Sequence, residues 1–122
     1  MNNTFAINKF FDISIIHKTY KFYLHLYSVN QTLPKKDRYG LGLKTENLAM
    51  QMLEMLFEAN AKSGSQRVEM LNKIDLKLKV LQTVIRLCWE AKALDENKYI
   101  KLQELLQEIG KMLGGWIKAT KM

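Results

Sequence analysis

The chain has 122 residues, of which 19 are Lys or Arg and 12 are Asp or Glu, so its formal net charge is +7. This length fits one domain, and the apolar and charged fractions of 48% and 25% exclude a disordered or fibrous chain. The only cysteine, Cys88, cannot form an internal disulfide, which suits a reducing compartment. Because there is no secretory signal and no run of about 18 apolar residues, we expect a cytoplasmic protein that spans no membrane.

One proline and six glycines leave little room for the turns of an all-β protein. Helix-forming sequence is interrupted at 33–42, at 63–66 and at 94–95. The sequence therefore predicts a single all-α domain with helices at about residues 12–32, 41–62, 66–93 and 95–119. The two later connections are short, so consecutive helices run antiparallel, and the expected fold is an up-down-up-down four-helix bundle.

The first two predicted helices carry apolar residues at helical spacing. In the first helix, one row consists of Ile13, Ile16, Tyr20, Tyr23 or Leu24, and Tyr27, and a second row beside it consists of Ile15, Phe22, Leu26 and Val29. In the second helix, the predicted core face consists of Leu48, Met52, Met55 or Leu56, and Ala59, widened by Ala49, Leu53 and Phe57.

The last two predicted helices repeat this pattern. The third has the most regular row, Leu71, Ile74, Leu78, Leu81, Ile85 and Cys88, with a parallel row of Val80, Val84, Leu87 and Ala91. The fourth begins at Asp95, a favourable N-cap that Glu96 follows in the first turn. Its apolar residues are Leu102, Leu105, Ile109, Met112 and Trp116.

The first, third and fourth helices have more apolar surface than the single stripe, about 100° wide, that a lone bundle needs. One interpretation is a generous core with a few apolar residues left in water, which is common in monomers. The other is that the second rows are buried against further copies of the chain.

No arrangement of residues indicates catalysis. A di-iron bundle requires Glu-x-x-His pairs, and neither histidine, His17 or His25, has a glutamate three residues before it. Cys88 lies in the apolar row of the third helix, where a thiol is usually inert packing. The segment 40–42 is too short for a phosphate-binding loop and lacks the Lys-Ser/Thr that follows one. We therefore predict no enzymatic activity, no metal and no cofactor.

Basic residues gather in two places. Lys35, Lys36 and Arg38 lie in the predicted first loop, and the third helix carries Lys73, Lys77, Lys79 and Arg86. These residues are candidates for contacts with nucleic-acid phosphates, although a lysine-rich face that only meets water would look the same. Arg86 has two interpretations: it belongs to a charge network with Asp75 and Lys79, or it projects toward a partner.

Two segments and one tripeptide carry a more specific signal. LPKKDRYGLG at 33–42, Ile85-Arg86-Leu87 and EIGKMLGGWIK at 108–118 resemble the accessory variability determinant proteins of diversity-generating retroelements. That family is related to the four-helix-bundle proteins encoded in the intervening sequences of bacterial large-subunit rRNA. The resemblance covers about residues 13–118.

The resemblance implies a non-catalytic, barrel-shaped homopentamer with a basic surface, encoded by a bacterium or a phage. It would bind the reverse transcriptase of the retroelement and a structured template RNA, or the cDNA and DNA derived from it, and so support adenine-mutagenic reverse transcription and retrohoming. The matched motifs include Arg38 and Arg86, and also Lys35 and Lys36, among the basic candidates. The alternative is a stand-alone nucleic-acid-binding bundle of the intervening-sequence type with no polymerase partner.

The glycines of the second segment have two interpretations. Gly110 and Gly114, four residues apart, would let two helices approach closely, with Trp116 packed over the gap. Alternatively, Gly114, Gly115 and Trp116 would be the loosely capped end of the fourth helix.

Overall fold

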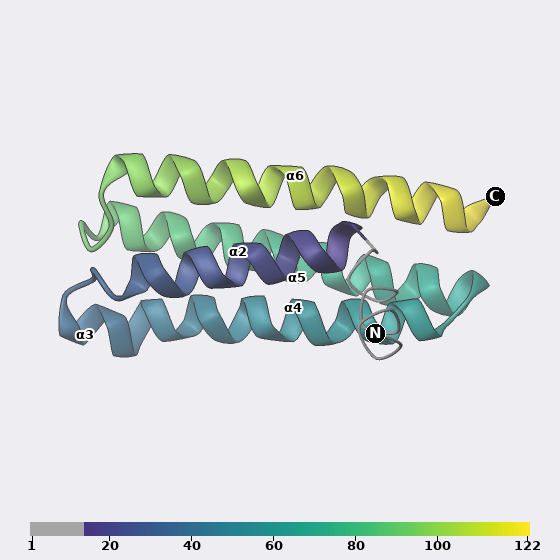
Figure 1. Ribbon diagram of the computed structural model, residues 1–122, viewed down its shortest axis with the longest axis horizontal. Helices are drawn as coiled ribbons and strands as arrows, with labels where there is room; N and C mark the ends of the chain where they lie inside the picture. Colours follow the sequence, from purple (N-terminus) through teal and green to yellow (C-terminus); the bar gives the residue numbers. More distant parts are fainter. Residues whose placement is uncertain (1–13) are drawn as a thin grey trace, which may run out of the picture.

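The computed structural model describes residues 14–122, which form four long helices lying side by side (Figure 1). In chain order the elements are α2 (Ser14–Asn30), the short α3 (Lys35–Asp37), the π-helix η1 (Arg38–Gly42), α4 (Leu43–Ala61), α5 (Gly64–Glu90) and α6 (Glu96–Lys121). The described residues contain no strand. The predicted all-α four-helix architecture is therefore confirmed.

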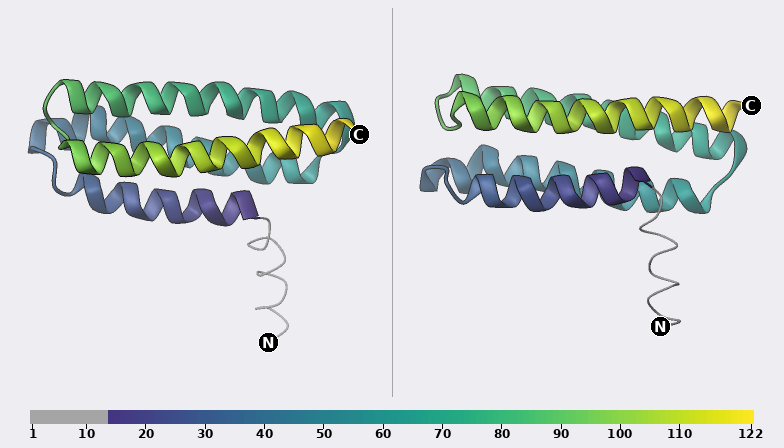
Figure 2. Two further views of the ribbon diagram at one scale, coloured as in Figure 1. Left: turned by 90° about the horizontal axis from the view of Figure 1, so that it is seen from above. Right: turned by 45° about the horizontal axis from the view of Figure 1, so that its top comes forward.

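Each long helix packs against two neighbours. α2 lies against α4 and α6, and α5 lies against the same two helices. Figure 2 shows the result as two layers, with α2 and α4 in one and α5 and α6 in the other. None of the helices among residues 14–122 is both long and apolar enough to cross a membrane.

The helix containing α4 begins earlier than the sequence predicts. The carbonyl of Pro34 accepts hydrogen bonds from the backbone N–H groups of Asp37 and Arg38, so the chain becomes helical directly after the proline. It reaches α4 through η1, where the backbone is kinked at Gly40, whose φ and ψ of −106° and −106° are not helical. Lys35, Lys36 and Arg38 consequently lie on a helix and not in a loop, which corrects the predicted organisation of this segment.

The π-helical turn is held in place by Asn30, which is buried at the end of α2. Its amide nitrogen donates to the Gly42 carbonyl at 3.0 Å and to the Glu46 carboxylate at 2.8 Å. Gly42 has no room for a side chain, because a Cβ there would lie 2.9 Å from the Leu33 side chain. The glycines that suggested a loop thus have two roles: Gly40 lies at the kink, and Gly42 lets the turn pack closely against the end of α2.

The core row of α2 is the second of the two rows in its sequence. Ile15, Phe22, Leu26 and Val29 are buried, together with Ile16, whereas the predicted first row is largely at the surface: Tyr20, Leu24 and Tyr27 are exposed and Tyr23 is half-buried. Ile13 lies outside the described residues. Helical spacing alone did not distinguish the rows. A tyrosine-rich row tolerates the surface better than a row of Ile, Phe, Leu and Val, because the phenol ring carries a polar hydroxyl.

The other helices follow their predicted patterns closely, except that Phe57, predicted to widen the core face of α4, is exposed. All six residues of the main α5 row are buried, from Leu71 to Cys88. In α6, Leu102 and Ile109 are buried as expected, but the deepest positions also include Leu106 and Leu113, while Leu105 and Met112 lie at the edge of the core. The exposed apolar side chains therefore lie mainly on α2, α4 and α5, and the α6 row expected to be in excess is largely used in packing.

The ends of α6 differ in how well they are stabilised. Asp95 is the N-cap, as predicted, since its side chain accepts a hydrogen bond of 2.9 Å from the backbone N–H of Lys98. At the other end α6 continues through Gly114 and Gly115 as far as Lys121. The interpretation of these glycines as a helix end is therefore wrong.

Candidate nucleic-acid interface

A groove with basic walls runs along the surface between α4 and α5. It has a volume of about 440 Å³ and is lined by Lys44, Leu48 and Met55 from α4 and by Lys73, Leu76, Lys77 and Val80 from α5. We refer to these seven residues as the α4/α5 groove. Three ammonium groups surround an apolar floor that contains no carboxylate. Such a combination can hold phosphates through its lysines and sugar or base surface through its floor.

The lysines of this groove are weakly engaged within the chain. Lys77 donates to the side-chain oxygen of Gln51 at 2.8 Å, and Lys73 lies 3.8 Å from a carboxylate oxygen of Glu69. Ion pairs between exposed side chains contribute only about 0–1 kcal/mol. A phosphate can therefore replace these partners at little cost.

Lys79 points away from the groove although it lies two residues after Lys77. Its ammonium group forms an exposed ion pair with Asp75, one helical turn earlier on α5. Lys35 and Lys36 are exposed on α3, at the end of the bundle where α2 is connected to α4 (Figure 1). The structure therefore brings Lys73 and Lys77 together with Lys44, and it does not bring them together with Lys35, Lys36 or Lys79.

Arg38 is engaged with the backbone of its own bundle. One of its terminal nitrogens donates to the Gln31 carbonyl at 3.0 Å and to the Leu33 carbonyl at 3.4 Å. These carbonyls belong to the connection that follows α2, where unpaired oxygens and a negative dipole favour a cation. The geometry corrects the view of Arg38 as a free basic side chain: it fastens α2 to the start of the next helix.

Of the two arginines within the resemblance motifs, Arg38 and Arg86, the second is the more exposed. Its side chain is 64% exposed, and its Nε donates to the Glu90 carboxylate at 2.6 Å. That hydrogen bond and the charge of Glu90 raise the pKa of Arg86 above its ordinary value. Asp75 and Lys79 pair with each other and not with Arg86. Of the Asp75–Lys79–Arg86 network that was one of the two interpretations, the Asp75–Lys79 pair is present, and Arg86 is not part of it.

The glycine-tryptophan segment of α6 has a packing role at only two of its four positions. A Cβ on Gly110 would lie 3.3 Å from a methyl group of Leu78 on α5, so the two helices are close there. Gly114 and Gly115 have open space where a Cβ would be. Trp116 is partly buried against the core, and the guanidinium of Arg67 lies 5.4 Å from the centre of its ring.

Lys44 was not among the basic residues predicted from the sequence. A simple signal could have found it. Because α4 and α5 form an antiparallel hairpin about the turn at 62–63, residues whose numbers sum to about 128 face each other, as Gln51 and Lys77 do. Lys44 then lies opposite the region after Val80, beside the other groove residues. A prediction from the third helix alone does not include the residues of α4 that face it, such as Lys44.

Cys88 and the acidic side chains are the other chemically reactive groups within residues 14–122. Cys88 is buried, and burial raises the pKa of its thiol to about 11, with a smaller contribution from the charge of Asp37. The thiol is therefore protonated at neutral pH and is a poor nucleophile. Within residues 14–122, no three His, Cys, Asp or Glu side chains are grouped as a metal site would require.

One comparison identifies the relationship of the chain to known proteins. A family model described as bAvd-like matches residues 13–120. The curated proteins contain no match to the chain. The match covers all four helices and both of the segments, 33–42 and 108–118, that carry the resemblance to accessory variability determinants.

Proposed function

Since this chain belongs to the bAvd-like family of accessory variability determinant proteins, we propose that it is the non-catalytic scaffold of a diversity-generating retroelement. In this role it binds the reverse transcriptase and the structured template RNA, or the cDNA made from it, in the bacterial cytoplasm. The polymerase carries out the adenine-mutagenic synthesis that precedes retrohoming. The observation that supports this role most directly is the α4/α5 groove, with its three lysines and apolar floor.

The proposed mechanism at the groove is electrostatic. Lys44, Lys73 and Lys77 neutralise successive phosphates and release the counterions that the RNA carries, which favours binding. Leu76 is 65% exposed and forms part of the floor, so it can contact a sugar or a base. These contacts read shape and charge more than sequence, which is what a scaffold for one structured RNA needs.

The proposed assembly is a homopentamer. Large apolar side chains outside the α4/α5 groove are exposed on three helices: Tyr20, Leu24 and Tyr27 on α2; Leu43, Met50 and Phe57 on α4; and Leu87 on α5. An exposed apolar surface of this extent is typical of a self-association interface. Head-to-tail contacts between identical copies close into a ring, and a ring would repeat the α4/α5 groove around the assembly.

Salt dependence of RNA binding tests the role of the groove. We expect the logarithm of the association constant for a structured RNA to fall linearly with the logarithm of salt concentration. Replacing Lys73 and Lys77 together by Gln should weaken binding and make the slope shallower by about 1–2. The matched control replaces Lys118 and Lys121, which are exposed at the end of α6, and should leave the slope nearly unchanged. The absence of RNA binding at 50 mM salt would contradict the proposal.

Co-purification tests the polymerase partner. The chain and the reverse transcriptase encoded beside it should elute as one complex, with or without nuclease treatment. A chain that binds RNA but never the neighbouring polymerase would instead be a stand-alone protein of the intervening-sequence type.

A further inference from the structure

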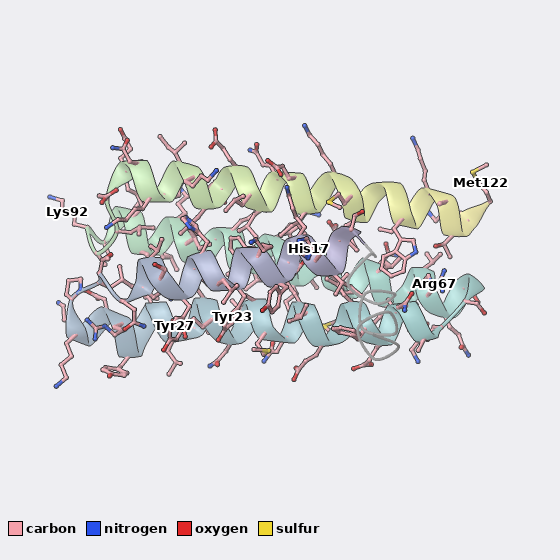
Figure 3. All side chains as sticks on the ribbon, in the orientation of Figure 1. His17, Tyr23, Tyr27, Arg67, Lys92 and Met122 are labelled. Carbon is pink, nitrogen blue, oxygen red and sulfur yellow. The ribbon has the colours of Figure 1, made fainter. Side chains whose placement is uncertain are left out.

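A second basic groove lies on the opposite side of the bundle, between α2 and α6. Its walls contain His17, Lys18, Lys21 and His25 from α2 and Lys101 from α6, and its floor is formed by Phe22 and Leu105. Figure 3 shows His17 on α2 beside α6. We refer to these seven residues as the α2/α6 groove. The chain has only two histidines, and both are in it.

The spacing on α2 explains why these residues lie together. His17, Lys21 and His25 follow one another at intervals of four residues, so they form a line along one face of the helix. α6 contributes Lys101 to the other wall and Leu105, four residues later on the same face, to the floor. The volume of the groove, about 390 Å³, is within the range of 300–1,000 Å³ typical of ligand sites and can hold more than one phosphate.

The charges that face the histidines are nearly all positive. From α2 they are Lys18 and Lys21, and from α6 they are Lys101 and the carboxylate of Glu108, which lies 2.6 Å from the Lys18 ammonium group. The lysine hydrogen bond holds the pKa of Glu108 below its usual range, so this carboxylate stays ionised and occupied by Lys18. α4 and α5 contribute no residue to the groove. Glu108 also feels the charge of Lys101, so one carboxylate faces three lysines, and the groove keeps an excess of positive charge beside its two imidazoles.

We infer that the α2/α6 groove is a second phosphate-binding track for the RNA, and that its two histidines make RNA binding stronger at acidic pH. The inference rests on the proposed function, because it assigns a further contact surface for the same ligand. Histidine is the side chain whose ordinary pKa, about 6.5, lies within the physiological range. An anion beside an imidazole favours the protonated form, so phosphate binding and proton uptake strengthen each other.

The direction of the pH dependence follows from this coupling. With three lysines and one carboxylate, the groove has an excess of two positive charges, and protonation of both histidines doubles it. This contribution is present in acid and is lost as pH rises. At constant ionic strength we expect RNA to bind about five- to tenfold more tightly at pH 6 than at pH 8, the size expected for two exposed ion pairs.

Two variants separate this groove from the rest of the surface. Replacing His17 and His25 together by Gln removes the titrating groups while keeping polar side chains, and should reduce the difference between pH 6 and pH 8 to less than about twofold. Replacing Lys21 and Lys101 by Gln should weaken binding at both pH values. The control with Lys118 and Lys121 replaced by Gln loses the same charge elsewhere on α6 and should keep the full pH dependence.

A direct measurement on the histidines completes the test. Proton NMR resolves the ring signals of His17 and His25, and the H17Q variant assigns them. Added RNA should shift both signals and raise the pH at which they titrate. RNA binding that depends on salt and on Lys73 and Lys77, but leaves the two histidine signals and the pH dependence unaffected, would overturn the second track while leaving the proposed function standing. No RNA binding at either pH would instead overturn the proposed function.

Discussion

The guanidinium of Arg67, near the start of α5, lies 5.4 Å from the centre of the Trp116 ring, near the end of α6. The same arginine donates hydrogen bonds to the carbonyls of Ala59, at 2.9 Å, and Asn60, at 3.2 Å, in the last turn of α4. Figure 3 shows Arg67 at the end of the bundle that also carries Met122. One side chain thus joins three helices at the short α4–α5 connection.

The first prediction is that this junction contributes measurably to stability. Arg67→Ala removes two charge-assisted hydrogen bonds and the contact with Trp116, so we expect a loss of about 1–3 kcal/mol and a melting temperature lower by about 4–10 °C. Thermal unfolding followed by circular dichroism measures it. Lys121→Ala, an exposed change on the same end of α6, is the control and should have almost no effect.

A double-mutant cycle separates the two contributions of Arg67. If the ring interaction matters, Arg67→Ala and Trp116→Leu should be coupled by about 0.5–1 kcal/mol. Strict additivity would place the whole effect of Arg67 in its hydrogen bonds to α4.

The second prediction contrasts the two arginines of the resemblance motifs. Arg86 is exposed and paired only with Glu90 on its own helix, so Arg86→Ala should change the melting temperature by no more than about 2 °C while weakening RNA or polymerase binding. Arg38→Ala leaves the Gln31 and Leu33 carbonyls without their donor. It should lower the free energy of unfolding by about 1–2 kcal/mol. The opposite ranking of the two variants in melting experiments would contradict these roles.

The helices and most of the core were predictable from spacing, because a long helix repeats its apolar positions every three or four residues. The row from Leu71 to Cys88 is the most regular apolar row of its helix, so the sequence identifies it as the core face, and all six of its residues are buried. In α2, two rows had the same spacing, and the choice depended on tertiary contacts that a single helix does not contain. Phe22 and Leu26 face the bundle, and Tyr20 and Leu24 do not.

The candidate site was less predictable, because a basic residue in the sequence does not reveal its partner. In the sequence, Arg38 and Lys73 are both basic residues with no visible partner. In the structure, Arg38 binds backbone carbonyls and Lys73 lines a groove. Both grooves lie between helices, so their residues come from segments far apart in the chain. Lys101 of the α2/α6 groove, for example, is 80 positions from Lys21 and shares no motif with it.

The third prediction concerns assembly. Light scattering at micromolar concentration should give a mass about five times the 14.3 kDa of the chain. Replacing Leu24 and Tyr27, which are 50% and 51% exposed on α2, by Glu should reduce that mass, because a buried interface does not tolerate unpaired carboxylates. Ile100→Glu changes a single exposed apolar residue on α6 and serves as the control. A monomer in the unmodified protein would show that the exposed rows are not an interface.

The last prediction uses the glycines of α6. Glycine in a helix interior is less favourable than alanine by about 0.8–1.0 kcal/mol, and Gly114 has open space where a Cβ would lie. Gly114→Ala should therefore raise the melting temperature by about 3–5 °C. Gly110→Ala gains the same helix propensity but brings its Cβ to 3.3 Å from a Leu78 methyl group, so the gain and the crowding should nearly cancel. The larger Gly110→Leu should be destabilising by about 1–3 kcal/mol, because it must displace Leu78 from the core. Calorimetry of the three variants should thus rank Gly114→Ala above the unmodified chain and Gly110→Leu well below it. A lower melting temperature for Gly114→Ala would contradict the prediction and show that another surface, such as a second copy of the chain, packs against Gly114 in solution.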